Sequence, residues 1–337
     1  MSRPPLAAQA ETHWVRTRDH WKVALHNYAR SSKKHPVFLC HGMGSNRFDL
    51  DFGTEKSLAK FLHRNGYDVW VVELRGAGLS TKPKWWNRYK HDWCFDDYVF
   101  HDLPAALHYV LRKTGAPGVH WVGHSMGGML AYPILETIDE GTLRTATTVG
   151  APLMTDEKNA ELGGIGGQMD WIRFLPFIPQ RTLARALLPL GRWGVEQFMR
   201  RANGILWNAD NMDTDDVMAL GRLAVEDLPV PLLLQLREWH KTSTFCSYYR
   251  RWNYVSHLKR VHTPLHVITG AADGLCPPAD CKVAYDLIGS KEKRFTVFGR
   301  EGGHKLDYGH VDLILGRHAS REVFPEILSW IEGYNGQ

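Results

Sequence analysis

The stretch Val119–Gly128, VHWVGHSMGG, restricts the fold of this chain more than any other. An apolar run typical of a buried strand leads directly into Gly123-His124-Ser125-Met126-Gly127, and a helical run, MGGMLAYPILETI, follows. So tight a turn between a strand and a helix forces the serine into a strained backbone conformation, and the flanking glycines relieve the crowding because they lack a Cβ. The turn lifts the Ser125 hydroxyl above the edge of a sheet, where another molecule can reach it.

Strand-like and helical segments alternate on both sides of this turn. A hairpin is expected at 13–29, buried strands at 36–42, 67–76, 118–123, 144–153, 263–274 and 293–299, and helices at 55–66, 96–115 and 321–334. Gly66 and Gly115 end two of these helices, as glycine commonly does. The alternation predicts an α/β fold with a mostly parallel, doubly wound sheet and helices on both faces.

The alternation stops near Pro152. Residues 153–255 are rich in glycine, proline and aromatic residues, contain helical patches and offer poor strand candidates. A structureless connection of this length is uncommon in a compact domain, so the segment has a structure of its own. We therefore expect a core formed by residues 1–152 and 256–337, interrupted by a helical lid (cap) insertion at 153–255.

Composition excludes several classes of function. Of 337 residues, 44% are hydrophobic and 23% charged, which is ordinary for a globular protein with a sizeable core. The net charge of +5 comes from 41 basic and 36 acidic residues mixed along the chain. No block of lysine or arginine is present, so nucleic-acid binding has no support.

The cysteines and the N-terminal segment indicate the cellular compartment in which the protein resides. The five cysteines, Cys40, Cys94, Cys246, Cys276 and Cys281, have neither zinc-site spacing nor a disulfide framework, so reduced thiols are expected. The segment MSRPPLAAQAETHW lacks the apolar core of a signal peptide, and no apolar run is long enough to span a bilayer. A cytoplasmic protein is the expectation.

A serine hydroxyl is a poor nucleophile unless a base takes its proton and a carboxylate orients that base. When the serine lies in a strand-turn-helix motif, the acid comes later in the chain and the histidine comes last, each after one of the final strands. Asp273, in HVITGAADGLCPP, lies just past a strand and is the favoured acid. Asp280 is the runner-up, but it falls in the expected next helix.

The histidine must come from the segment after the last strand, FTVFGREGGHKLDYGHVDLILG. It offers His304, in a glycine-rich stretch, and His310, where a loop enters the final apolar run. His310 is favoured and His304 is kept as the alternative. His124, next to the serine, is expected to pack against the sheet, because adjacent side chains diverge in such a turn.

When this serine attacks a carbonyl group, the negative oxygen of the tetrahedral intermediate needs two hydrogen-bond donors. One is expected to be the backbone N–H of Met126, the residue after the nucleophile. The other is expected from the loop CHGMGSN, with the Met43 N–H as the best candidate because His41-Gly42 forms a turn there.

With these residues in view, the chain resembles the α/β-hydrolase superfamily. Within it, HGMGSNRFDLD, GYDVWVVELRGAGLS, VHWVGHSMGGML and YGHVDLILGRHASREVFPEILSW are similar to the acid-lipase-like esterases. There is also some similarity to polyhydroxyalkanoate synthases, whose nucleophile is a cysteine; Ser125 at that position implies ester hydrolysis. The resemblance supports His310 as the base, since it lies in the GH-x-D segment. One departure is Glu73-Leu74-Arg75-Gly76, where Asp-x-Arg-Gly is common; these residues usually organise the sheet edge.

Specificity is expected to reside in the insertion. Its aromatic side chains suit a hydrophobic acyl group, although most such residues simply pack a lid onto a core. The substrate-binding candidates are Trp171, Phe174, Phe177 and Trp207. DWIRFLPFIP, residues 170–179, would also suit transient contact with a lipid surface.

The sequence therefore predicts a serine hydrolase that cleaves carboxylic esters of hydrophobic acids through an acyl-enzyme on Ser125. Two alternatives stay open: an acyltransferase with the same catalytic groups, and a non-catalytic homologue that binds a hydrophobic ligand. No metal or organic cofactor is implied, because serine, histidine and carboxylate suffice. The sequence gives no basis for an oligomeric state.

Overall fold

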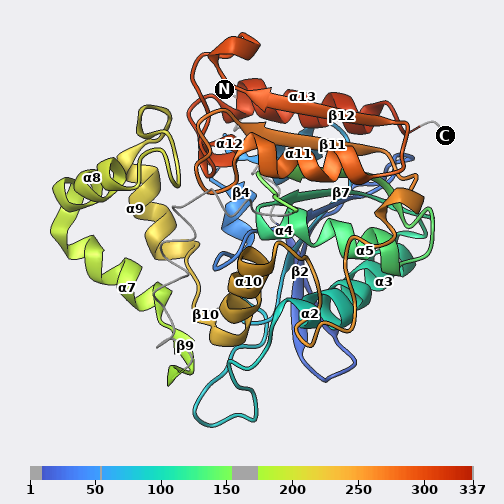
Figure 1. The fold of residues 1–337 in the computed structure, drawn as a ribbon, viewed down its shortest axis with the longest axis horizontal. Helices are drawn as coiled ribbons and strands as arrows, with labels where there is room; N and C mark the ends of the chain where they lie inside the picture. The colour runs from blue at the N-terminus through green and yellow to red at the C-terminus, as the bar shows by residue number, and fades with distance from the viewer. Residues whose placement is uncertain (1–9, 54, 154–173, 336–337) are drawn as a thin grey trace, which may run out of the picture.

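A computed structural model describes residues 10–53, 55–153 and 174–335 of the chain (Figure 1). Its centre is an eight-stranded sheet with strand order β1-β2-β6-β3-β7-β8-β11-β12. The first two strands pair antiparallel, β2 runs antiparallel to β6, and the remaining pairings are parallel. The strands are β1 (Glu11–Arg16), β2 (Lys22–Tyr28), β3 (Val37–Cys40), β6 (Val69–Glu73), β7 (Val119–His124), β8 (Leu143–Val149), β11 (Leu265–Gly270) and β12 (Lys293–Phe298).

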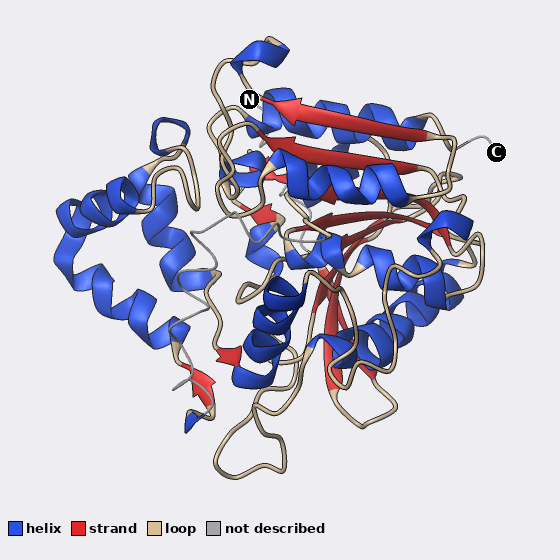
Figure 2. Ribbon diagram, in the orientation of Figure 1, coloured by secondary structure: helices blue, strands red, loops and turns tan. Residues whose placement is uncertain are grey.

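Helices cover both faces of this sheet, as Figure 2 shows. They are α1 (Leu58–Arg64), α2 (Phe95–Asp97), α3 (Leu103–Thr114), α4 (Met126–Met129), α5 (Ala131–Thr137), α11 (Pro278–Leu287), α12 (Asp312–Leu315) and α13 (Ala319–Glu332). A short pair, β4 (Asp51–Phe52) and β5 (Lys56–Ser57), precedes α1. The predicted mostly parallel sheet between two helical layers is confirmed.

Strand side chains alternate between two hydrophobic cores, one on each face of the sheet. Phe38 and Cys40 of β3 join the core that α3, α5 and α11 cover. Val37 and Leu39 join the core that α1 and α13 cover. Both faces of β3 are therefore buried, which explains why its sequence is an unbroken apolar run rather than an alternating one.

The inserted segment contributes no strand to the large sheet in its described part, residues 174–255. It holds α7 (Gln180–Leu187), α8 (Gly191–Arg201), α9 (Thr214–Leu223) and α10 (Val230–Thr242), with a small pair formed by β9 (Phe177–Ile178) and β10 (Leu228–Pro229). In Figure 1, α7, α8 and α9 lie to the left of the sheet, and α10 lies closer to it.

Some local features differ from the expectation. A π-helical turn, Tyr98–Asp102, joins α2 to α3 within what the sequence pattern indicates as one helix. The helix after Ser125 is divided at Leu130 into α4 and α5. All five cysteines are unpaired, as expected. Among the described residues, no helix combines the length and the apolar character needed to cross a bilayer.

Candidate active site

Ser125 occupies the turn between β7 and α4 with φ 54° and ψ −124°. A positive φ is uncommon outside glycine and is held in place only by the surrounding structure. A Cβ on Gly123 would lie 2.2 Å from the Gly127 carbonyl oxygen, and one on Gly127 would lie 2.1 Å from the Cys40 carbonyl oxygen. Both flanking glycines are therefore required by close backbone contacts as well as by the turn.

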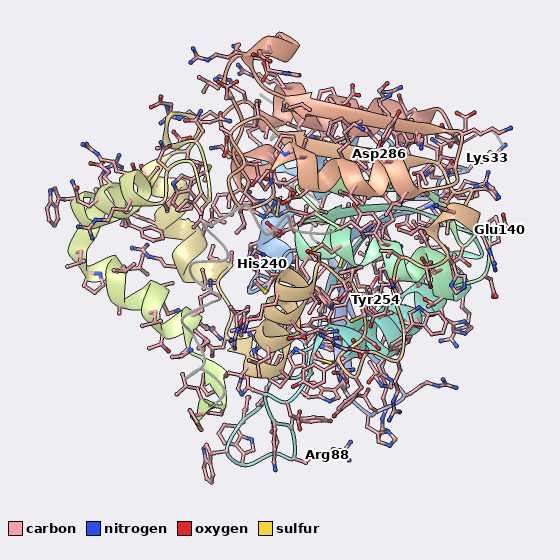
Figure 3. The ribbon with its side chains drawn as sticks, viewed as in Figure 1. Lys33, Arg88, Glu140, His240, Tyr254 and Asp286 are labelled. Atoms are coloured by element: carbon pink, nitrogen blue, oxygen red, sulfur yellow. The ribbon has the colours of Figure 1, made fainter. Side chains whose placement is uncertain are left out.

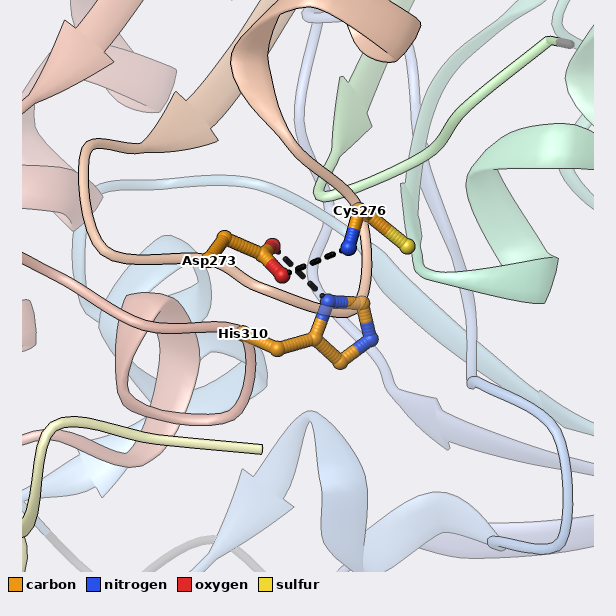
Figure 4. Close-up of side chains that lie close together, drawn as sticks. All are labelled: Asp273, Cys276 and His310. Carbon is orange, nitrogen blue, oxygen red and sulfur yellow. Dashed lines mark hydrogen bonds and ion pairs between the residues drawn. The ribbon is translucent and has the colours of Figure 1, made fainter. Parts of the chain in front are cut away.

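Asp273 and His310 form a buried hydrogen-bonded pair (Figure 4). Nδ1 of His310 lies 2.9 Å from Oδ2 of Asp273. The other carboxylate oxygen, Oδ1, accepts the backbone N–H groups of Leu275 at 3.1 Å and Cys276 at 2.7 Å. Because Nδ1 faces the carboxylate, it carries a proton, and in the neutral ring Nε2 keeps the lone pair that a base needs.

Close backbone approaches bring these groups to one edge of the sheet. Gly150 follows β8 with φ +56°, and a Cβ on it would lie 3.1 Å from Nδ1 of His310. Gly42 follows β3, and a Cβ on it would lie 3.1 Å from Cβ of Ser125. His124 links the two sides, since its ring centroid lies 4.9 Å from that of His310. Ser125 therefore shares the carboxyl edge of the parallel strands with the Asp273–His310 pair.

The alternative acid and base lie elsewhere. Nδ1 of His304 lies 3.0 Å from the carbonyl oxygen of Gly299, and its ring packs 4.4 Å from Phe298. Asp280 lies in the first turn of α11, as expected. The structure therefore pairs Asp273 with His310 and not with His304.

The loop after β3 carries Met43, the first expected oxyanion donor. The Gly42 N–H donates to Oδ2 of Asp49 at 2.8 Å, which fixes this loop just before Met43. Met126, the second expected donor, begins α4 with a buried side chain. The first N–H groups of a helix have no partner within the helix, so the Met126 N–H is free of the helical ladder.

A buried ion pair that the sequence did not reveal lies beneath the site. Nδ1 of His124 lies 3.0 and 2.9 Å from the two carboxylate oxygens of Asp49, and its Nε2–H donates to the carbonyl oxygen of His310 at 3.2 Å. Burial opposes charge on His124, but the Asp49 carboxylate outweighs it, so the pKa of His124 is raised. Burial likewise opposes charge on Asp49, but the adjacent His124 holds the pKa of Asp49 below its usual value. His124 is thus buried as expected, but as a charged partner.

The segment Glu73-Leu74-Arg75-Gly76 organises the edge of the sheet at the end of β6. The Arg75 guanidinium contacts Asp102 at 2.8 Å and Asp19 at 2.7 Å. Oε2 of Glu73 lies 2.9 Å from Nε2 of His26. The glutamate that replaces the common aspartate therefore contacts a buried histidine of the neighbouring strand β2.

The predicted substrate-binding residues are scattered. Trp171 lies outside the described residues. Phe174 is 75% exposed, and the ring of Phe177 stacks on His91 at 4.2 Å. Trp207 is 5% exposed and belongs to a hydrophobic core. Phe174, Phe177 and Trp207 therefore lie in three different surroundings: at the surface, against His91 and within a core.

Two clusters of potential metal ligands occur among the described residues. They are Asp273–Cys276–His310 and Asp19–Asp97–His101. In the first, both oxygens of Asp273 already accept N–H groups. In the second, Arg75 contacts both carboxylates and supplies the positive charge that a metal would bring.

Comparison with known proteins decides the family. Residues 35–306 match the sequence profile of the alpha/beta hydrolase fold family. The chain is an alpha/beta hydrolase. This membership and the observed sheet confirm the predicted fold class.

Curated relatives of this alpha/beta hydrolase include lipases. It is 25% identical to Lipase 3 of Drosophila melanogaster over 371 residues, covering 96% of this chain and 90% of that protein. It is 31% identical over 143 residues to human lysosomal acid lipase/cholesteryl ester hydrolase, covering 39% of this chain and 36% of that protein. The resemblance to acid-lipase-like proteins is confirmed.

Solved structures share the fold of this alpha/beta hydrolase at low identity. An esterase from Pyrococcus furiosus matches with a TM-score of 0.59 and 17% identity, covering all of this chain and 96% of that one. A thermophilic esterase from Thermogutta terrifontis matches with a TM-score of 0.59 and 15% identity, covering 96% and 99% of the two chains.

Proposed function

We propose that this alpha/beta hydrolase cleaves carboxylic esters of hydrophobic acids through an acyl-enzyme on Ser125. The observation that carries the proposal is the 2.9 Å Asp273–His310 hydrogen bond at the sheet edge where Ser125 occupies its strained turn. Serine, carboxylate and histidine, which follow one another along the chain in this order, are the groups that activate a hydroxyl for acyl transfer. The lipase names of the curated relatives support an ester as substrate.

In the first half of the reaction, Oγ of Ser125 attacks the ester carbonyl carbon while Nε2 of His310 takes the hydroxyl proton. Asp273 holds Nδ1–H and stabilises the imidazolium that forms. The tetrahedral intermediate collapses, the C–O bond to the alcohol breaks, and His310 gives its proton to the departing alkoxide. In the second half, His310 takes a proton from water, whose oxygen attacks the acyl carbon. The bond from this carbon to Oγ of Ser125 then breaks, the acid leaves, and His310 returns the proton to Oγ.

The negative oxygen of each tetrahedral intermediate accepts hydrogen bonds from the backbone N–H groups of Met43 and Met126. Donors of this kind contribute about 10²- to 10³-fold to turnover. Both are backbone groups, so the side chains at these positions can vary. The support is positional: Met43 follows Gly42, which approaches Ser125 closely, and Met126 directly follows Ser125.

We further propose that residues 153–255 act as a cap over the site, because their described part contacts the loops that carry it. A Cβ on Gly44 would lie 2.5 Å from Oε1 of Gln180. A Cβ on Gly274, next to Asp273, would lie 2.1 Å from a carbonyl oxygen of the insertion, and Gly309, next to His310, approaches the backbone of Trp207. The insertion therefore borders the space in which an acyl chain would lie.

The test is hydrolysis of p-nitrophenyl esters of increasing acyl length by the wild type and by Ser125→Ala. We expect turnover by the wild type that rises with acyl length, and a loss of several orders of magnitude in Ser125→Ala. A fluorophosphonate should label the wild type on Ser125 and leave the variant unlabelled.

Two results would contradict the proposal. Absence of both turnover and labelling would favour a protein that only binds a hydrophobic ligand. Formation of new esters or thioesters in preference to free acid, when alcohols or thiols are added, would instead favour an acyltransferase.

A further inference from the structure

The ring of His124 has acceptors on both sides. Its Nδ1 faces the Asp49 carboxylate at 2.9 Å and its Nε2 faces the His310 carbonyl oxygen at 3.2 Å. Neither acceptor can donate, so both contacts are hydrogen bonds only if both ring nitrogens carry protons. His124 is then an imidazolium, paired with a carboxylate, and both side chains are buried. It has no lone pair with which to act as a base.

This ion pair contacts all three segments of the proposed site. Oδ2 of Asp49 accepts the N–H of Gly42, the residue before Met43. His124 directly precedes Ser125 in the turn. Its Nε2–H holds the backbone of His310 itself. One ion pair therefore joins the backbones that carry the oxyanion donor, the nucleophile and the base.

We infer that His124 and Asp49 are positioning residues, whose imidazolium–carboxylate pair sets the distances between Met43, Ser125 and His310. This inference rests on the proposed function. The pair does not touch the substrate; it acts through backbone hydrogen bonds. A misplacement of about 1 Å among reacting groups can cost about 10²-fold in rate, so the contribution is expected in kcat rather than in KM.

The test compares Asp49→Asn with Asp51→Asn, a matched control. Asp51 is also a buried carboxylate, but it accepts the hydroxyls of Tyr28 and Ser57 at 2.7 Å. Both variants should lose stability. Only Asp49→Asn should lower kcat on a soluble p-nitrophenyl ester, by about 10- to 100-fold with little change in KM. Asp49→Glu, which keeps the charge, should recover part of that loss.

The rate of Ser125 labelling by a fluorophosphonate separates failure of this inference from failure of the proposed function. If the wild type labels and turns over while Asp49→Asn matches Asp51→Asn in both rates, the pair is only structural and the inference is wrong. A wild type that neither labels nor turns over rejects the proposed function, and the positioning role with it.

A second inference concerns a surface loop, residues 82–91, that follows β6 and is here named the tryptophan loop. Trp85 is 92% exposed and Trp86 is 64% exposed, with ring centroids 5.3 Å apart. Arg88, labelled in Figure 3, lies where this loop projects from the body of the molecule. Because β6 and β7 both run parallel to β3, the loop leaves the same edge of the sheet as Ser125.

The base of the tryptophan loop is held while its tip is exposed. The Tyr89 hydroxyl donates to the His20 carbonyl oxygen at 2.9 Å, and its ring lies 4.7 Å from that of Trp21. His91 stacks on Phe177 of the insertion at 4.2 Å. The two exposed indoles are therefore presented by a supported loop.

The charges of the tryptophan loop are all positive. Lys84, Arg88 and Lys90 are exposed, and the sequence has no acidic residue between Glu73 and Asp92. Exposed tryptophans beside basic residues are typical of segments that lie in the headgroup region of an anionic bilayer. We propose that the tryptophan loop binds an anionic lipid surface and turns the site edge toward it. This contact is distinct from the one expected at residues 170–179, of which 170–173 lie outside the described residues.

Sedimentation with vesicles tests this binding. The wild type should sediment with phosphatidylcholine–phosphatidylglycerol vesicles more than with pure phosphatidylcholine, and less at high salt. Trp85→Ala/Trp86→Ala and Lys84→Glu/Arg88→Glu should each weaken binding about 10-fold or more. The control Trp193→Ala, which removes an exposed indole of α8, should bind as the wild type does.

Sedimentation needs no turnover, so the result is independent of the proposed function. All these variants should also keep wild-type turnover of a soluble short-chain ester. Equal sedimentation of the wild type and Trp85→Ala/Trp86→Ala would overturn the inference. So would the absence of binding to anionic vesicles.

Discussion

At Gly127 the backbone after Ser125 lies directly against the end of β3. A Cβ there would stand 2.1 Å from the Cys40 carbonyl oxygen and 2.7 Å from that of His41. Both are backbone atoms, one at the end of β3 and one in the residue after it, and they cannot turn aside as a flexible side chain can. The glycine therefore determines how closely the turn approaches the loop of Met43.

We predict that Gly127→Ala lowers the free energy of unfolding by about 3 kcal/mol or more, because overpacking a core costs about 1–3 kcal/mol and here the clash is with backbone. Urea denaturation measures the change. The control is Gly221→Ala in α9, where the nearest atom is 3.6 Å from the added Cβ. It should stabilise by about 0.5–1 kcal/mol, since alanine is the better helix former. Equal effects of the two substitutions would contradict this account.

Among the elements, the end of β6 is tied to the helices that follow it by one guanidinium. Arg75 donates from Nε to Asp102 at 2.9 Å, and its backbone N–H donates to the same carboxylate at 2.9 Å. Asp102 ends the π-helical turn before α3. Burial raises the pKa of Asp102 above its usual value although Arg75 opposes this. The strand and the helix are thus joined through a buried charge that needs its partner.

We predict that Arg75→Met destabilises the protein by about 3–5 kcal/mol, because Asp102 then stays buried without a counter-charge. Without Arg75 the pKa of Asp102 rises further in the native state. The native protein then binds a proton that the unfolded chain releases, so its free energy of unfolding falls as pH rises. The loss should therefore be smaller at about pH 5 than at about pH 8. Arg317→Met, which breaks a surface pair with Asp213, should cost less than about 1 kcal/mol. An equal loss at both pH values would contradict this assignment.

Elements set by local pattern could be predicted from the sequence, and contacts between distant segments could not. The strand before Ser125 and the turn at 123–127 follow from apolar runs and glycines a few residues apart. Asp273 could be found because it follows a strand. Asp49 could not, since it meets His124 from 75 residues away and no local pattern indicates that contact. The aromatic composition of the insertion could not predict that Trp207 is buried and that Phe174 is exposed.

On the scale of the whole molecule, the central sheet buries His120 and His266 in their neutral form. Burial lowers the pKa of His120 in β7 to about 4 and that of His266 in β11 to about 3. An unfolded histidine titrates near about 6.5. Between these values the unfolded chain binds protons that the folded chain does not. The free energy of unfolding is therefore unaffected by these two residues above about pH 6.5, and it decreases as pH falls toward their native pKa values.

We predict that the free energy of unfolding falls by about 3–4 kcal/mol from pH 7 to pH 5, about 2 kcal/mol for each histidine. His266→Gln should remove about half of this dependence. His124 acts in the opposite sense, because its raised pKa gives stability that is lost as pH rises above about 6.5. Urea denaturation between pH 5 and pH 7 measures the effect of His120 and His266, and denaturation above pH 7 measures that of His124. Unchanged pH dependence in His266→Gln would show that His266 is protonated in the folded state.

The central claim is that His310, held by Asp273, is the base for Ser125. Its most direct test is kcat/KM on a p-nitrophenyl ester for His310→Ala and His304→Ala, with folding checked by circular dichroism. We predict a loss of at least about 10³-fold for His310→Ala and a change of less than about 3-fold for His304→Ala. The reverse pattern, or near-wild-type activity in His310→Ala, would contradict the account.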